Sequence, residues 1–401
     1  MNISKLSDKT LTLLISDLLE NKSESDPENL QLIFNELCNT SPRLECIKLL
    51  LESDKVDLTV RDNYAIRWAS ENGHTQIVEL LLKCDKVDPT SLDNYAIKEA
   101  SQNGHTQVVE LLLKCDKVDI TAQNNYAIRW ASLNGHMQVV ELLLKCDKVD
   151  PAAEDNYAIR YASRNGYTQI VELLLKCDKV DVTALDNYAI RLASLNGHTQ
   201  VVELLLKCDK VNVTTYNNYA IKMASSNGHT QVVKLLLKCD KVDVTAEDNY
   251  AIRYASRNGH TQIVELLLKC DKVNPTASDN YAIKQASKNA HIDIIKILLN
   301  SGKINLTNIT DRLILSLVAT EPNPKSDKLF YIKKIVSLMK TINLTSIAIC
   351  TEDGIDKIQI TQLFIDNKTT DTIDKIIKSM KKYCITKVDI NNEIIFVVNI
   401  N

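Results

Sequence analysis

The stretch DNYAIRWASENGHTQIVELLLKCDKVDPTSL, residues 62–92, decides the fold of this chain because it recurs with few changes. Its tetrad Asn-Tyr-Ala-Ile returns every 31 residues, in copies that begin at Asn63, Asn94, Asn125, Asn156, Asn187, Asn218, Asn249 and Asn280. A period of this length is the signature of stacked supersecondary units. The sequence therefore predicts a solenoid, whose function lies on a surface and not in a single pocket.

Each copy contains the pattern of two short helices. Apolar residues recur three and four positions apart in 65–69 and again in 77–82, as on one face of an amphipathic helix. Gly73 lies between the two runs, where the end of a helix favours a residue that adopts positive φ. Helices this short are marginal alone, so burial against neighbouring copies must stabilise them. We expect an all-α solenoid of about ten stacked helix pairs, with degenerate caps and a short mixed C-terminal tail.

Four segments follow from where the repeat is regular and where it fades. Residues 1–57 are expected to form N-terminal capping helices with a degenerate repeat, and residues 58–309 an array with eight regular 31-residue units. Residues 310–341 are expected to form a degenerate capping repeat, followed by a tail of unknown role, 342–401. In that tail, CITKVDI and EIIFVVNIN predict two strands around an Asn-Asn turn.

The motif Ala69-Ser70-x-x-Gly73-His74, followed by Ile77-Val78-Glu79-Leu80-Leu81-Leu82, resembles the ankyrin repeat. It is similar to that family's Ala-Ala-x-x-Gly-His and its downstream Val-Val-x-Leu-Leu-Leu. The opening Tyr64-Ala65-Ile66-Arg67 departs from the family's Thr-Pro-Leu-His, and the shorter period predicts shortened or unpaired hairpins. The variant Asp-Asn-Tyr-Ala-Ile-Arg resembles arrays of giant DNA viruses of amoebae. The resemblance implies a non-enzymatic scaffold that binds a protein along its concave face.

Comparison of the copies shows three variable positions, which are represented by Arg61 in the loop and by Trp68 and Glu71 on the first helix. Residues three apart share a helix face, and the resemblance places this face and the loop on the partner-binding surface. The candidate partner-binding residues are Trp68, Glu71, Glu99, Trp130, Leu133, Tyr161, Arg164, Leu192, Tyr216, Met223, Tyr254 and Arg257. The aromatic residues are candidate anchors, because Trp, Tyr and Arg dominate interface energies. The alternative is neutral drift at tolerant surface positions.

Cysteine and histidine each recur at a fixed position of the repeat, which we call the cysteine and histidine ladders. Both residue types could suggest a reactive site, but we expect them to belong to the scaffold. Seven cysteines, from Cys84 to Cys270, occupy one repeat position. Adjacent repeats pack roughly 8–10 Å apart, beyond the roughly 7 Å that a disulfide allows between Cα atoms, so we expect reduced thiols. His74 and Cys84 lie at opposite ends of one helix, about 15 Å apart, which excludes a Cys-His pair within a repeat. We expect no enzyme, with no catalytic residues, no cofactor and no metal.

A ladder of Arg and Lys that begins at Arg67 could follow a phosphate backbone. Recurring aspartates nearby and a net charge of −3 instead favour local ion pairs. Nucleic-acid binding along the Arg/Lys ladder is therefore a minor alternative.

The N-terminal residues 6–19, LSDKTLTLLISDLL, are similar in spacing to the opening helix of an F-box. That likeness implies an alternative function as substrate adaptor of a ubiquitin ligase, whereas a capping helix explains the same pattern.

No apolar run approaches the roughly 20 residues needed to cross a bilayer, and the N-terminus lacks the features of a secretory signal. We expect a monomer in the cytoplasm, the host cytoplasm if it is viral, that is not secreted. It would bind a protein such as a host protein, with no small-molecule substrate and no membrane.

Overall fold

The computed structural model describes residues 6–20, 26–40, 43–289, 291–303, 347–352, 355–360, 385–390 and 393–398. These residues form helices α1 to α19 and strands β1 to β4. They divide into two compact units, one comprising Met1–Ala193 and His198–Asn212, the other Ser194–Gly197 and Val213–Asn401. Each unit is described by itself below.

Every regular repeat folds as a pair of helices, as the apolar periodicity predicts. The first helices are α4 (Val60–Glu71), α6 (Ser91–Gln102), α8 (Ala122–Asn134), α10 (Ala153–Asn165), α12 (Ala184–Leu195), α14 (Thr215–Ser226), α16 (Ala246–Asn258) and α18 (Ala277–Lys288). The second helices are α5 (Thr75–Leu82), α7 (Thr106–Leu113), α9 (Met137–Leu144), α11 (Thr168–Leu174), α13 (Thr199–Leu206), α15 (Thr230–Leu236), α17 (Thr261–Leu268) and α19 (Ile292–Asn300).

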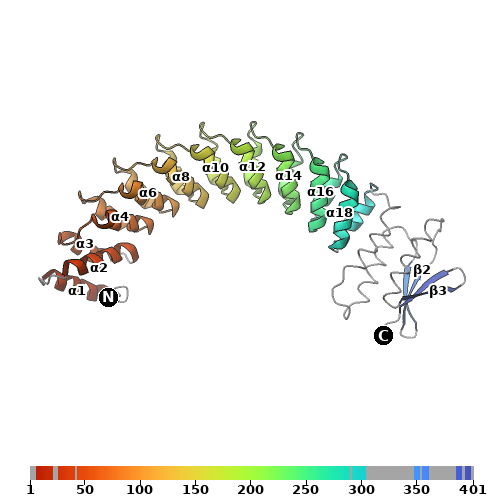
Figure 1. The fold of residues 1–401 in the computed structure, drawn as a ribbon, viewed down its shortest axis with the longest axis horizontal. Helices are drawn as coiled ribbons and strands as arrows, with labels where there is room; N and C mark the ends of the chain where they lie inside the picture. The colour runs from red at the N-terminus through yellow and green to blue at the C-terminus, as the bar shows by residue number, and fades with distance from the viewer. Residues whose placement is uncertain are drawn as a thin grey trace. The chain divides into compact units, whose positions relative to one another are not determined.

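Within each unit the pairs stack in sequence order (Figure 1). In the first unit α4 packs on α6, α6 on α8 and α8 on α10, and in the second unit α14 packs on α16 and α16 on α18. Each pair buries the small and apolar residues that the periodicity marks, as Ala127 and Ile128 of α8 and Val139, Val140 and Leu143 of α9 illustrate. The core is therefore a continuous layer between first and second helices, and the fold is a repeat solenoid.

Each first helix opens with a left-handed turn that the sequence analysis did not predict. In α8 the three residues Gln123, Asn124 and Asn125 have φ of 51°, 54° and 58°, and the same three positions have positive φ in the other seven copies. Asn and Asp tolerate this region better than most residues, which explains why they fill the second and third positions. The shortened connection therefore enters the first helix through this turn.

The end of the first helix agrees with the prediction for glycine. Gly135 closes α8 with φ of 82°, and its counterparts from Gly73 to Gly259 also have positive φ. This left-handed residue reverses the chain towards the second helix.

The N-terminal residues form α1 (Asp8–Glu20), α2 (Asp26–Thr40) and α3 (Leu44–Glu52). Helix α1 packs on α2 and α3, and its Leu11 and Ile15 are completely buried.

In the tail, β1 (Ile347–Glu352), β2 (Ile355–Ile360), β3 (Ile385–Ile390) and β4 (Glu393–Val398) form an antiparallel sheet in the order β1-β2-β4-β3. Strands β3 and β4 pair as predicted, with Ile390 opposite Glu393. The predicted capping repeat at 310–341 lies outside the described residues. No described helix is both long and apolar enough to cross a membrane.

Candidate protein-binding surface

The asparagine of the recurring tetrad ties each first helix to the following loop. Asn125 Oδ1 accepts a hydrogen bond from the Asp150 backbone N–H at 2.7 Å, and Asn125 is 8% exposed. The equivalent bond recurs at Asn63, Asn94, Asn156, Asn187, Asn218 and Asn249, at 2.7–2.8 Å. A buried N–H without this partner would be costly, so the asparagine is fixed by the scaffold.

The arginine ladder caps the left-handed turn, a role that differs from the predicted pairing with aspartate. Arg129 donates from Nε to the Asn124 carbonyl at 2.9 Å and from Nη2 to the Gln123 carbonyl at 2.8 Å. The same pair of bonds recurs at Arg67, Arg160, Arg191 and Arg253. The forked guanidinium matches two adjacent carbonyls, which explains why arginine bonds to the main chain here. Ion pairs with carboxylates occur in the lysine copies, for example Lys98 with Asp93 at 3.9 Å.

These bonds leave the ladder poorly suited to bind phosphates. Arg67, Lys98, Arg160 and Lys222 are each at most 8% exposed. The guanidinium of Arg129 also lies over the ring of Tyr157 in the next repeat, 5.4 Å from its centroid. The ladder thus connects neighbouring first helices and gives no support to the nucleic-acid alternative.

The histidine ladder joins the turns between paired helices. His105 Nε2 hydrogen-bonds with the Glu71 carbonyl of the preceding repeat at 2.8 Å. Its ring packs so closely on Gly73 that a Cβ there would lie 2.5 Å from Nδ1. The histidine thus makes a hydrogen bond that stabilises the turn, and its ring contact adds a second reason for glycine at this position.

The predicted partner-binding residues all lie on the first helices or their opening turns, outside the core. Arg164, Arg257 and Tyr216 are exposed, Tyr216 to 59%. The other nine are partly exposed: Trp68, Glu71, Glu99, Trp130, Leu133, Tyr161, Leu192, Met223 and Tyr254. We call the surface that carries them the first-helix face.

In the first unit, rings from three successive repeats form a continuous aromatic row on this face. The centroids of Tyr126, Trp130, Tyr157, Tyr161 and Tyr188 follow one another at 5.3, 6.4, 4.1 and 5.9 Å. Offset-stacked and tilted rings at such distances attract one another, so the row is held in place before any partner binds.

A second row lies in the other unit, where Tyr250, Tyr254 and Tyr281 follow at 4.0 and 5.8 Å. Both rows contain tyrosines of the Asn-Tyr-Ala-Ile tetrad, which sequence comparison missed because these residues never vary. Their position four residues before the variable aromatic was the available signal, since residues four apart share a helix face.

The repeat before the aromatic row carries Glu99 in place of the variable aromatic residue. The Tyr95 hydroxyl donates to Glu71 Oε2 at 2.6 Å, and Gln102 donates to Glu99 Oε2 at 3.1 Å. Burial raises the pKa of Glu99, and the Glu71 charge raises it further. The first-helix face therefore carries an acidic segment beside the aromatic row.

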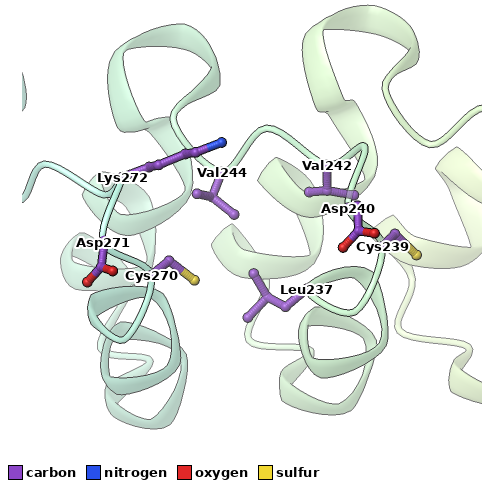
Figure 2. A pocket seen from close by; sticks show the side chains of 8 residues that line it. All are labelled: Leu237, Cys239, Asp240, Val242, Val244, Cys270, Asp271 and Lys272. Atoms are coloured by element: carbon purple, nitrogen blue, oxygen red, sulfur yellow. The ribbon is translucent and has the colours of Figure 1, made fainter.

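A shallow cavity lies on a different part of the second unit, between the loops that follow α15 and α17 (Figure 2). It encloses about 310 Å³ and is lined by Leu237, Cys239, Asp240, Val242, Val244, Cys270, Asp271 and Lys272. Burial raises the pKa of the Cys239 and Cys270 thiols, and each donates to the carbonyl of the leucine four residues earlier, at 3.8 Å. Thiols held protonated in this way are poor nucleophiles.

The cysteines of the described residues are free thiols, and no group of acidic, histidine and cysteine residues among them could hold a metal ion.

The family model for ankyrin repeats in three copies matches residues 35–124, 97–186, 159–248 and 221–308. The matches cover more than half of the chain, and the protein belongs to the ankyrin-repeat family. Ankyrin repeats generally mediate protein–protein interaction, and no catalytic family is indicated. The crystal structure of the human ASB11 ankyrin repeat domain is similar over 46% of this chain and 95% of its own length, with 19% identity and a TM-score of 0.39. No curated protein matches this sequence.

Proposed function

We propose that this protein is a non-enzymatic scaffold that binds a partner protein through the first-helix face, the surface predicted to be concave. The single observation that carries the proposal is the aromatic row from Tyr126 to Tyr188. Large aromatic side chains anchor many interfaces, and rings already held in place lose little conformational entropy on binding. The remaining candidate residues then vary the surface around this row, with Glu71 and Glu99 on one side and Leu192 on the other.

The partner is proposed to be a protein that meets this chain in the cytoplasm. The resemblance to giant-virus arrays supports a host protein in an infected cell. The adaptor alternative gains no support from α1, because the helix buries Leu11 and Ile15 against α2 and α3 as a cap would.

The test compares two double variants of the full chain that differ in the face they alter. Trp130→Ala with Tyr161→Ala removes the centre of the aromatic row, whereas Glu141→Ala with Glu172→Ala alters exposed residues of α9 and α11. Each variant is used for affinity purification from lysate of the natural host cell, with quantitative mass spectrometry. We expect proteins captured by the wild type to be depleted only by the first variant. Loss of hot-spot residues costs about 2 kcal/mol or more, roughly a thirtyfold weaker affinity.

Circular dichroism and thermal melting of both variants show whether the stack is intact. Leu81→Asp, which places a carboxylate at a fully buried position, supplies the misfolded reference. Equal capture by the two double variants, with both folded, would contradict binding through the aromatic row.

A further inference from the structure

Two first helices in different units have the same sequence. Helices α10 and α16 both read AEDNYAIRYASRN, over 153–165 and 246–258. The identity includes both variable helix positions, where other copies differ. We call the two groups the tyrosine–arginine subsites: Tyr157, Tyr161, Arg164 and Tyr188 in the first unit, and Tyr250, Tyr254, Arg257 and Tyr281 in the second.

The side chains of the two subsites share one geometry. Tyr157 stacks on Tyr161 at 4.1 Å between centroids, and Tyr250 stacks on Tyr254 at 4.0 Å. The next tyrosine follows at 5.9 Å in the first subsite and at 5.8 Å in the second. Because the surrounding repeats differ, with Trp130 before one subsite and Met223 before the other, the shared geometry belongs to the subsites themselves.

An exposed guanidinium lies against the variable tyrosine of each subsite. The Arg164 guanidinium lies 5.8 Å from the Tyr161 centroid, and that of Arg257 lies 5.6 Å from Tyr254. Arg257 also donates to the Tyr281 hydroxyl at 3.4 Å. The planar fork of N–H donors on an arginine matches a carboxylate.

A second arginine side chain lies near the variable tyrosine of each subsite, in addition to the exposed arginine. The Arg160 guanidinium lies 5.5 Å from the Tyr161 centroid, and the Arg253 guanidinium lies 5.8 Å from that of Tyr254. The exposed carboxylates of the same repeat, such as Glu154, belong to the opening turn, ten residues before Arg164 in the sequence. The arginine side chains beside each tyrosine are therefore the charges that would attract an anion to the subsite.

We propose that the two tyrosine–arginine subsites are equivalent and that each receives an Asp or Glu side chain from an extended acidic segment of the partner protein. The carboxylate pairs with Arg164 or Arg257, and the adjoining partner residue packs on the tyrosine rings. This inference rests on the proposed function and adds to it the chemistry of the partner and a valence of two. A partner that carries two such segments, joined by a linker long enough to reach both subsites, gains avidity, which can exceed the affinity of one segment by about 10²-fold or more.

An acidic protein segment fits these subsites better than nucleic acid, although Tyr and Arg can also stack on bases. The opening turns of the same repeats expose Glu154, Asp155, Glu247 and Asp248. These carboxylates repel a continuous phosphate backbone, whereas a peptide can place isolated acidic residues away from them.

The experiment starts with a phage-displayed library of random linear peptides, selected on the full-length protein. A parallel selection uses the Arg164→Ala, Arg257→Ala double variant. We expect peptides rich in Asp and Glu from the wild type only. The strongest peptide is then titrated by calorimetry, with two peptides bound per wild-type chain, one per chain of either single variant and none on the double variant.

The matched control is Lys288→Ala, which removes an exposed cation at the same helix position in a copy that has Gln285 in place of the tyrosine. This control should keep both binding events. Two peptide copies are then joined by flexible linkers of increasing length. The tandem whose linker reaches both subsites should bind on the order of 10²-fold more tightly than one copy, and either single arginine variant should abolish that gain.

Three results would overturn the inference: enrichment without acidic residues, a stoichiometry of one that Arg257→Ala leaves unchanged, or preferential capture of single-stranded nucleic acid in a competing selection. These results leave the proposed function intact if Trp130→Ala with Tyr161→Ala still depletes host proteins. The proposed function itself would fail if the Trp130→Ala, Tyr161→Ala variant captured the same host proteins as the wild type.

Discussion

The amide oxygen of Asn125 lies 2.7 Å from the backbone nitrogen of Asp150, so one buried side chain joins a first helix to the loop that ends the same repeat. Replacement of Asn125 by Ala removes this acceptor and places a residue that disfavours positive φ at φ of 58°. We expect a loss of about 2–4 kcal/mol in the free energy of unfolding, measured by urea denaturation.

Asn125→Gly separates the two causes, because glycine adopts the left-handed conformation without strain. It should lose only the hydrogen-bond contribution, about 1–3 kcal/mol. If the Ala and Gly variants are equally stable, the left-handed turn is not strained for alanine at this position.

The contact between Gly104 and His136 predicts a coupled pair of substitutions. A Cβ at Gly104 would lie 2.4 Å from His136 Nδ1, and Gly104 has φ of 80°. Gly104→Ala should therefore destabilise the protein by more than the roughly 1 kcal/mol typical of left-handed strain alone. A double-mutant cycle with His136→Ala, followed by thermal unfolding, measures the steric part. Removal of the ring should restore part of the stability, and strict additivity would show that the ring moves aside freely.

A buried hydroxyl in every regular repeat offers a route to greater stability. Ser132 is completely buried and its hydroxyl has no hydrogen-bond partner, as in the equivalent serines of the other seven copies. Ser132→Ala restores the alanine pair of the family motif and should stabilise the protein by about 1 kcal/mol, because no desolvated hydroxyl remains. Urea denaturation provides the measurement.

Ser91 is the contrasting case, because its hydroxyl accepts a hydrogen bond from Asn63 Nδ2 at 2.7 Å. Ser91→Ala should be neutral or destabilising. The same sign of change for both serines would contradict the account.

Leucine in the left-handed turn should be another source of strain. Leu185 has φ of 50° although its side chain is 50% exposed. Leu185→Asn, which brings in a residue that tolerates this conformation, should raise the free energy of unfolding by about 0.5–1 kcal/mol. Leu133→Asn, which changes a first-helix residue of ordinary conformation, is the comparison and should give no such gain. Thermal melting of both variants tests this expectation.

The raised pKa of Glu99 predicts a pH dependence with a definite sign. Because the folded-state pKa lies above the unfolded value, the folded protein binds the proton more tightly. The carboxylate therefore destabilises the fold once the pH exceeds its folded pKa, and this penalty disappears as the pH falls below the unfolded value. Glu99→Gln should be more stable than the wild type at neutral pH.

That advantage should disappear towards pH 4, about the unfolded pKa of glutamate. Urea denaturation at several pH values provides the test. Glu154→Gln, at an exposed turn position, should show no comparable change, and a constant difference between wild type and Glu99→Gln across the series would contradict the account.

The sequence predicted the helix pairs well because their cause is repeated and local: apolar residues at helical spacing, and a glycine between the two runs. The left-handed turn was not predictable in the same way. Asn124 and Asn125 suit it, but Leu92 and Tyr216 occupy its first position with φ of 52° and 51°, against the usual preference of such residues. Where the ladder residue is an arginine, its bonds to two carbonyls show how the turn is stabilised, as Arg129 illustrates. The copies that contain Leu92 and Tyr216 have Lys98 and Lys222 at that position instead.

The candidate surface was predicted in part, for a different reason. Variation among copies marks Trp130 and Tyr161, because a partly exposed residue outside the core is free to change. It cannot mark Tyr157, which is constant and yet contacts both rings. Constancy therefore predicted a scaffold role for the histidine ladder, but it also concealed part of the aromatic row.

The asparagine bond also bears on how the number of repeats can change. Each copy provides both the acceptor and the N–H of this bond, because Asn125 and Asp150 lie in the same 31-residue copy. Insertion or deletion of one whole copy thus leaves every donor and acceptor of this kind matched. The number of repeats can therefore increase or decrease while these hydrogen bonds are kept. The number of repeats between the two tyrosine–arginine subsites can change in the same way while each subsite keeps its geometry.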